Sequence, residues 1–215
     1  AKKEIFDAPV AGPLMRAMKH LPVDRSAGAS SLVDAVERLR AGQLVGIFPE
    51  ATISRSFELK EFKNGAARIA AEADAPLIPM VIWGSQRIWT KGHPKRLGRT
   101  NTPVFIRIGE PIDPSGSPDE AIARLKDAMQ VLLDRVKDDY TRAYGPFPAG
   151  EYWIPAEDGG SAPTLIDARR IDTEAKAAKA AKAEKKAAAK LDKRADAKLG
   201  NARSFIDMVK EKLRR

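Results

Sequence analysis

Apolar residues recur three or four positions apart in several stretches of the chain, and this spacing is typical of an amphipathic helix. Residues 30–40 and 64–74 show it, and the longest example runs from residue 118 to Tyr144. In that longest stretch the apolar positions are Ile122, Leu125, Met129, Leu132, Leu133 and Val136. A shorter stretch near the start carries Leu14, Met15, Met18 and Leu21. The spacing therefore predicts helices in all of these places.

Other segments are apolar in the way that β-strands are. Residues 44–48 and 77–83 are almost entirely apolar, which is typical of buried strands. Residues 104–108 alternate apolar and polar positions, as a strand with one buried face does. Strands that alternate with helices predict an α/β layered domain, with a central, mostly parallel or mixed sheet flanked by helices.

The chain changes composition twice after the longest predicted helix. Residues 145–166 are rich in Gly and Pro, which indicates an irregular extension of the α/β domain at residues 1–144. Residues 167–215 are rich in Ala, Lys and Glu, and they predict a solvated helical tail. The tail ends in a basic amphipathic segment that includes Phe205, Val209 and Leu213. Such a segment can lie on an anionic membrane, and a solubilising or partner-binding helix is the alternative.

Charge and cysteine content narrow the classes of function. The 215 residues carry a net charge of +9, so the expected partner is anionic: a phospholipid surface, a phosphorylated substrate or nucleic acid. The absence of cysteine excludes disulfides, thiolate metal sites and a cysteine nucleophile. No apolar run is long enough to cross a bilayer, so any membrane contact is expected to be peripheral.

One loop stands out by its charge. Residues 86–102, between the second and third predicted strands, contain no acidic residue. The cations of this cationic loop are Arg87, Lys91, Lys95, Arg96 and Arg99. The sequence therefore predicts a surface for anions here.

Polar residues also follow the first predicted strand. Pro49 ends that strand, and Glu50, Thr52 and Arg55 come after it. Open α/β sheets place their ligands at the carboxyl ends of the strands, and a hydroxyl beside a guanidinium suits an anion. A surface turn rich in Ser and Thr is the alternative interpretation of the same residues.

Five short blocks give the chain a family resemblance. They are Ala1–Phe6, Leu21–Arg25, Phe48–Thr52, Phe62–Gly65 and Leu77–Met80. In this order they resemble the blocks A-K-x-E-L, I-x-V-D-R, F-P-E-G-T, F-K-x-G and V-I-P-V of the glycerolipid acyltransferases, the family that includes lysophosphatidic acid acyltransferase. The resemblance covers roughly the first 110 residues and depends on the whole set of blocks.

The resemblance implies which residues bind the phosphate of the acyl acceptor. Lys2 and Arg25 are expected to face the glycerol phosphate, to which Lys and Arg donate charge-assisted hydrogen bonds. Glu50 and Thr52 match F-P-E-G-T, and Glu50 is expected to shape the phosphate pocket. Lys63 matches F-K-x-G at the start of a helix, where free amides assist anion binding.

The chain departs from the family pattern in the same loop. Ala51 replaces the Gly of F-P-E-G-T, and its methyl group restricts positive φ. Ile53 stands where the family commonly has Arg, and the guanidinium appears at Arg55. Arg55 reaches the same phosphate if the loop bulges, and a different acceptor head group is the alternative. For Arg25, an ion pair with the neighbouring Asp24 or with a helix end is an alternative role, and for Lys2 the alternative is a solvated surface charge.

The catalytic base of the family has no match in this chain. The resemblance implies a histidine in an H-x-x-x-x-D motif, which deprotonates the acceptor hydroxyl. His20 and Asp24 are spaced H-x-x-x-D, one residue short, and His93 has no acid at the right offset. The motif is expected upstream of Ala1, because A-K-x-E-L follows it in the family. We therefore assign no catalytic residue and interpret His20 as a partly exposed histidine at a helix end.

The resemblance implies a peripheral enzyme at the cytoplasmic face of a membrane. It would transfer a fatty acyl group from acyl-CoA or acyl carrier protein to a hydroxyl of a lysophospholipid, such as lysophosphatidic acid, in phospholipid biosynthesis. The acyl thioester is a co-substrate, and no cofactor or metal is implied. A non-catalytic lipid-binding or scaffold protein with the same fold is the alternative. Nucleic-acid binding is disfavoured, because the Lys-rich tail lacks interleaved aromatic residues.

Overall fold

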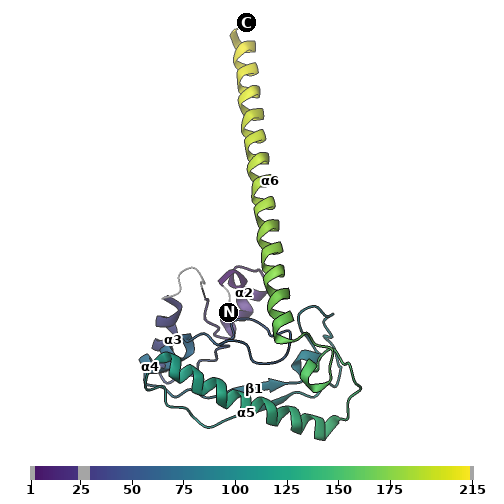
Figure 1. The fold of residues 1–215 in the computed structure, drawn as a ribbon. Helices are drawn as coiled ribbons and strands as arrows, with labels where there is room; N and C mark the ends of the chain where they lie inside the picture. Colours follow the sequence, from purple (N-terminus) through teal and green to yellow (C-terminus); the bar gives the residue numbers. More distant parts are fainter. Residues whose placement is uncertain (1–2, 24–29, 214–215) are drawn as a thin grey trace. The chain divides into compact units, whose positions relative to one another are not determined.

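The computed structural model describes residues 3–23 and 30–213, with the backbone alone at residues 30, 31 and 190–213. Its helices and strands are α1 (Lys3–Phe6), α2 (Ala11–Ala17), α3 (Ser30–Arg40), α4 (Gly65–Ala73), β1 (Met80–Trp83), β2 (Phe105–Ile108), α5 (Pro118–Tyr144) and α6 (Leu165–Leu213) (Figure 1). Short 3₁₀ turns lie at Ser85–Arg87 and Ala156–Asp158. The chain divides into two units, residues 1–165 and residues 166–215.

The sheet of the first unit consists of β1 and β2, which run antiparallel with Met80 opposite Ile108. The strands predicted at residues 77–83 and 104–108 are thus confirmed in position. The mostly parallel or mixed order predicted for a central sheet is not seen in the described part of the chain. The physical reason is the connection: parallel neighbours need a crossover, and residues 84–104 contain only a 3₁₀ turn.

Residues 44–48, predicted as a strand, form an irregular coil, so this prediction is wrong. Leu44 is 99% exposed and Phe48 is 79% exposed. A strand forms where a neighbour pairs with its N–H and C=O groups, and no strand lies beside this segment within the described residues. An apolar run without such a neighbour does not make a strand.

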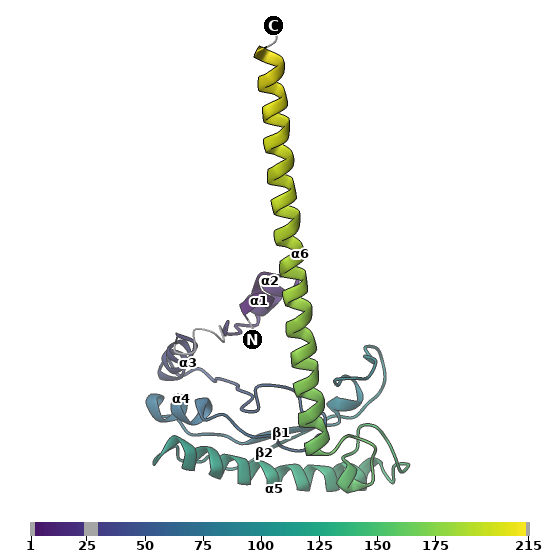
Figure 2. The same ribbon diagram turned by 45° about the horizontal axis from the view of Figure 1, so that its top comes forward.

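α5 packs against one face of the sheet and against α4 (Figure 2). A capping box fixes its start. The Ser117 hydroxyl accepts the N–H of Glu120 at 3.2 Å, and the Glu120 carboxylate accepts the N–H of Ser117 at 2.9 Å. The core between α5 and the sheet contains Val81, Trp83, Leu133, Val136, Tyr140 and Trp153. The prediction of one long amphipathic helix is confirmed.

The Gly- and Pro-rich segment that follows α5 contributes to the same core. Trp153 is 3% exposed, and its ring meets the ring of Phe147 edge-on with centroids 4.8 Å apart. The Glu151 carboxylate accepts the indole N–H of Trp153 at 3.0 Å. This segment has an irregular backbone, yet its aromatic side chains pack on α5 and the sheet.

The remaining helices of the first unit pack in series. α3 contacts α4 through Ala35, Val36 and Ile69. α4 contacts α5 through small residues, which are Ala66, Ala67, Ala70 and Ala121. The helices predicted at residues 30–40 and 64–74 are confirmed. The short helix predicted around Leu14 ends earlier than its apolar pattern, at Ala17, because Lys19 adopts a left-handed φ of +55°.

The second unit is a single helix, the remainder of α6. Near its start Arg170 pairs with Asp167 at 3.2 Å and with Glu174 at 3.4 Å. Residues 173–189 are exposed throughout. The predicted amphipathic end, with Phe205, Val209 and Leu213, lies outside the described side chains. None of the described helices combines the length and apolarity that crossing a membrane requires.

Candidate functional site

Hydrogen bonds to Glu50 and Pro49 hold the motif loop, which we define as residues 49–63. The Glu50 carboxylate accepts the backbone N–H of Lys60 at 3.4 Å, while the Pro49 carbonyl accepts the backbone N–H of Lys63 at 3.0 Å. Burial raises the pKa of Glu50 above its ordinary value of 4.5, although the Lys60 N–H and nearby lysine charges lower it in part. These contacts suit a residue that shapes the loop.

Glu50→Gln is expected to change how stability depends on pH. The pKa of Glu50 is raised in the folded state, so as pH increases from 4.5 the Glu50 carboxyl loses its proton first in the unfolded chain. This carboxyl therefore lowers the free energy of unfolding as pH rises through the window between the two pKa values, and the loss remains above that window. Glutamine keeps an acceptor for the Lys60 N–H and has no proton to lose. Urea unfolding of both proteins across this window measures the difference, and parallel pH profiles would contradict the raised pKa.

Ala51 adopts a backbone conformation that favours glycine. Its φ is +59°, and its N–H donates to the Phe48 carbonyl at 3.1 Å, which closes a tight turn. A Cβ atom in the left-handed region typically costs about 1–2 kcal/mol. The turn therefore keeps the shape that the family's Gly permits, with a strained Ala in its place.

Ala51→Gly is expected to raise the free energy of unfolding by about 0.5–1 kcal/mol, because glycine relieves the strain and this gain exceeds its larger unfolded-state entropy. Thermal unfolding measures the change. The matched control is Ala71→Gly at an exposed position of α4, where about 1 kcal/mol should be lost. Destabilisation of similar size in both variants would show that Ala51 is not strained.

Thr52 and Arg55 of the motif loop meet the cationic loop, residues 86–102. The Thr52 hydroxyl accepts a hydrogen bond from Nζ of Lys91 at 2.8 Å. Nη1 of Arg55 lies 3.2 Å from the position that a Cβ on Gly92 would take, and Gly92 has a φ of +83°. Two cations and a hydroxyl are thus gathered in one region, and such a group suits a phosphate.

The structure brings together only some of the residues that the sequence predicts for the site. Glu50, Thr52, Arg55 and Lys63 all lie in the motif loop, and the side chain of Lys63 is exposed just before α4 begins. The backbone hydrogen bond between Lys63 and Pro49 connects the start of this helix to the loop. Lys2 and Arg25 lie outside the described residues.

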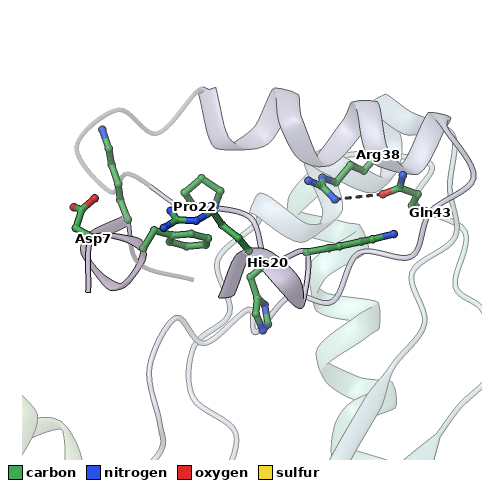
Figure 3. Close-up of a pocket in the computed structure, with 9 residues that line it drawn as sticks. Asp7, His20, Pro22, Arg38 and Gln43 are labelled. Carbon is green, nitrogen blue, oxygen red and sulfur yellow. Dashed lines mark hydrogen bonds between the residues drawn. The ribbon is translucent and has the colours of Figure 1, made fainter. Parts of the chain in front are cut away.

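A hollow of about 770 Å³ lies among α1, α2 and α3 (Figure 3). Its lining residues are Lys3, Phe6, Asp7, Arg16, Lys19, His20, Pro22, Arg38 and Gln43. Nη1 of Arg38 donates to Oε1 of Gln43 at 3.4 Å. The basic side chains that line the hollow outnumber the acidic one, Asp7, so the hollow suits an anionic ligand. The sequence patterns did not reveal it, because its cations come from separate segments.

His20 lies at this hollow without a carboxylate partner in the described part of the chain. Its backbone N–H donates to the Met15 carbonyl at 3.0 Å at the end of α2. Figure 3 shows its ring directed away from Arg38 and Gln43. His93 instead stacks on Tyr152, with ring centroids 4.3 Å apart. Neither histidine has the oriented geometry of a general base.

The chain is similar to known acyltransferases. The family model described as Acyltransferase matches residues 1–83. The chain is 30% identical over 138 residues to a 1-acyl-sn-glycerol-3-phosphate acyltransferase from Limnanthes douglasii, covering 62% of this chain and 47% of the relative. It is 32% identical over 145 residues to the enzyme of that name from Bacillus subtilis, covering 64% and 66%. The chain is thus similar to acyltransferases of this family.

A solved structure of the same family has a similar fold. It is the 1-acyl-sn-glycerophosphate (LPA) acyltransferase from Thermotoga maritima, with a TM-score of 0.53 and 26% identity, covering 64% of this chain and 55% of that one. The chain thus spans about half to two thirds of the lengths of these acyltransferases. The match to the family model contains the motif loop and ends at Trp83, so Lys91 and the rest of the cationic loop lie beyond it.

Proposed function

We propose that the protein transfers a fatty acyl group from an acyl thioester to a hydroxyl of a lysophospholipid such as lysophosphatidic acid, in phospholipid biosynthesis. The observation that carries this proposal is the match of the chain, motif loop included, to relatives named 1-acyl-sn-glycerol-3-phosphate acyltransferase. The thioester donor is acyl-CoA or acyl carrier protein. Both substrates are anionic, which fits the net charge of +9.

The motif loop is proposed to bind the phosphate of the acceptor. Lys91 and Arg55 would donate charge-assisted hydrogen bonds to its oxygens, and the Thr52 hydroxyl can donate another. Glu50 would keep the loop in shape by its bond to the Lys60 N–H. Lys2, Arg25 and Lys63 are proposed from the family resemblance to complete the phosphate site.

The reaction itself is an acyl substitution. The acceptor hydroxyl attacks the thioester carbonyl, the C–S bond breaks, and the hydroxyl proton passes through a general base to the leaving thiolate. Holding the acceptor's phosphate fixes the distance between hydroxyl and thioester, which lowers the entropic part of the barrier. The described residues would therefore act by positioning the acceptor hydroxyl relative to the thioester.

The proposal is tested by following thiol release from acyl-CoA and from acyl carrier protein with a thiol reagent, using the full-length protein. Lysophosphatidic acid is the acceptor, and a monoacylglycerol without the phosphate is the matched control. We expect release that depends on the acceptor and strongly prefers the phosphorylated one. Binding of lysophosphatidic acid without thiol release from either donor would contradict the proposal and favour a lipid-binding protein.

A further inference from the structure

The cationic loop is anchored to the core at Arg87 and is held further by a bond within the loop. The Tyr152 hydroxyl donates to the Arg87 carbonyl at 3.2 Å, and the Arg87 guanidinium donates to the Tyr140 hydroxyl at 2.9 Å. Farther along, the N–H of Arg96 donates to the Ile88 carbonyl at 2.8 Å. These bonds fix the loop between β1 and β2, so its outward-facing side chains are held in place.

Two large apolar side chains point outward from this fixed loop. Trp89 is 54% exposed and Leu97 is 73% exposed. The other tryptophans of the chain are buried, since Trp83 is 5% exposed and Trp153 is 3% exposed. Tryptophan is favoured at the boundary between lipid tails and water, where its apolar ring and its N–H are both accommodated.

The exposed apolar side chains are surrounded by positive charge. Nζ of Lys95 lies 4.2 Å from the centroid of the Trp89 ring, and Arg96 and Arg99 are exposed nearby in sequence. Arg87 is directed inward, with its guanidinium carbon 4.6 Å from the centroid of the Trp153 ring. Because residues 86–102 contain no acid, the loop itself adds no negative charge that would repel an anionic surface.

The same loop touches the motif loop. Lys91 donates to Thr52, and Gly92 lies against Arg55, so the cationic loop carries both the outward side chains and one cation of the proposed phosphate site. A lipid that is held at the outward side of this segment is therefore near the phosphate site. This proximity relates the surface to the substrate.

We infer that Trp89 and Leu97, flanked by Lys95, Arg96 and Arg99, dock the first unit onto an anionic phospholipid bilayer. The rings and side-chain carbons enter the interface while the cations contact lipid phosphates. The acceptor then reaches the motif loop from the membrane surface. This inference rests on the proposed function for the identity of the lipid substrate, and docking itself requires no turnover.

Vesicle binding of the full chain tests the inference. With vesicles of phosphatidylcholine and phosphatidylglycerol at low salt, K95A/R96A/R99A is expected to weaken binding by about 100-fold, because each Lys or Arg near the surface contributes roughly a factor of five. The matched control, K176A/K179A/K182A on α6, removes the same charge from exposed positions and should change binding little. Equal weakening in both variants would overturn the inference, since it would show attraction by net charge alone.

Tryptophan fluorescence reports on the docking contact itself. Because Trp89 is the exposed tryptophan, lipids with brominated acyl chains should quench the wild type and lose most of that effect in Trp89→Phe, which keeps an apolar ring. Bound protein without quenching would overturn the inference. Binding to a single-stranded oligonucleotide in place of vesicles would overturn it in favour of nucleic acid.

The inference and the proposed function fail separately. Vesicle binding is measured without an acyl donor, so a chain that docks through Trp89 and transfers no acyl group contradicts only the proposed function. Acyl transfer in the full-length protein with vesicle binding unaffected by K95A/R96A/R99A contradicts only the docking surface. Circular dichroism and thermal unfolding of each variant confirm that it folds.

Discussion

Replacement of Lys91 or Arg55 by alanine is expected to lower kcat/KM for lysophosphatidic acid by about 10- to 100-fold, because losing a hydrogen bond to a charged group typically costs about 1.5–3 kcal/mol. Use of a monoacylglycerol acceptor should change far less, since it has no phosphate. Nζ of Lys91 donates to the Thr52 hydroxyl at 2.8 Å, and Arg55 approaches the cationic loop at Gly92. Thiol release with each acceptor measures both effects.

The controls for this prediction separate binding from folding. Arg55→Lys should recover only part of the activity, because lysine cannot form the forked pair of bonds that a guanidinium makes with a phosphate. Lys176→Ala removes one exposed charge from α6 and should leave both acceptors unaffected. Equal losses with both acceptors in Lys91→Ala would assign Lys91 a structural role. An unchanged Arg55→Ala would place Arg55 outside the phosphate site.

Trp153→Ala is expected to lower the free energy of unfolding by about 3–5 kcal/mol, the usual range for truncating a buried aromatic side chain. The ring contacts Phe147 and lies beneath the Arg87 guanidinium, so its loss leaves a cavity and removes a cation–π contact. Urea unfolding measures the change. A large loss would show that residues 145–163 are part of the folded core of the first unit.

Trp89→Ala is the control for this prediction, because the same residue type is exposed there. It should change the free energy of unfolding by less than about 1 kcal/mol. Similar effects of the two substitutions would mean that the segment around Trp153 contributes little to the core. The pair therefore distinguishes a packed segment from an irregular extension.

The helices were predictable because their signals are local. The capping box at Ser117, the Pro that follows it and the apolar spacing of α5 are all contained in the segment itself. The strand predicted at residues 44–48 failed for the opposite reason. Its formation depends on a partner strand, which an apolar run cannot supply, and Leu44 is fully exposed without one.

The sequence predicted the motif loop and the cationic loop as separate anion sites, and it did not predict the contact between them. Glu50, Thr52 and Lys63 were recognised by their fixed order, and no comparison tests the roles proposed for them. The bond from Lys91 to Thr52 joins residues 39 positions apart, and no periodicity or spacing encodes such a contact. The burial of Trp153 was missed for a related reason, because Gly and Pro describe the backbone of that segment while its aromatic rings determine its packing.

The backbone N–H groups of residues 44–48 can report, by hydrogen exchange, on whatever binds beside the motif loop. These N–H groups have no backbone acceptor within the described residues, so deuterium should replace their hydrogens without any opening of the fold. In α5, Val136 and Tyr140 are fully buried, and the amides there should exchange only when the core unfolds. Slower deuterium uptake at residues 44–48 alone would therefore report a strand or ligand that pairs with them.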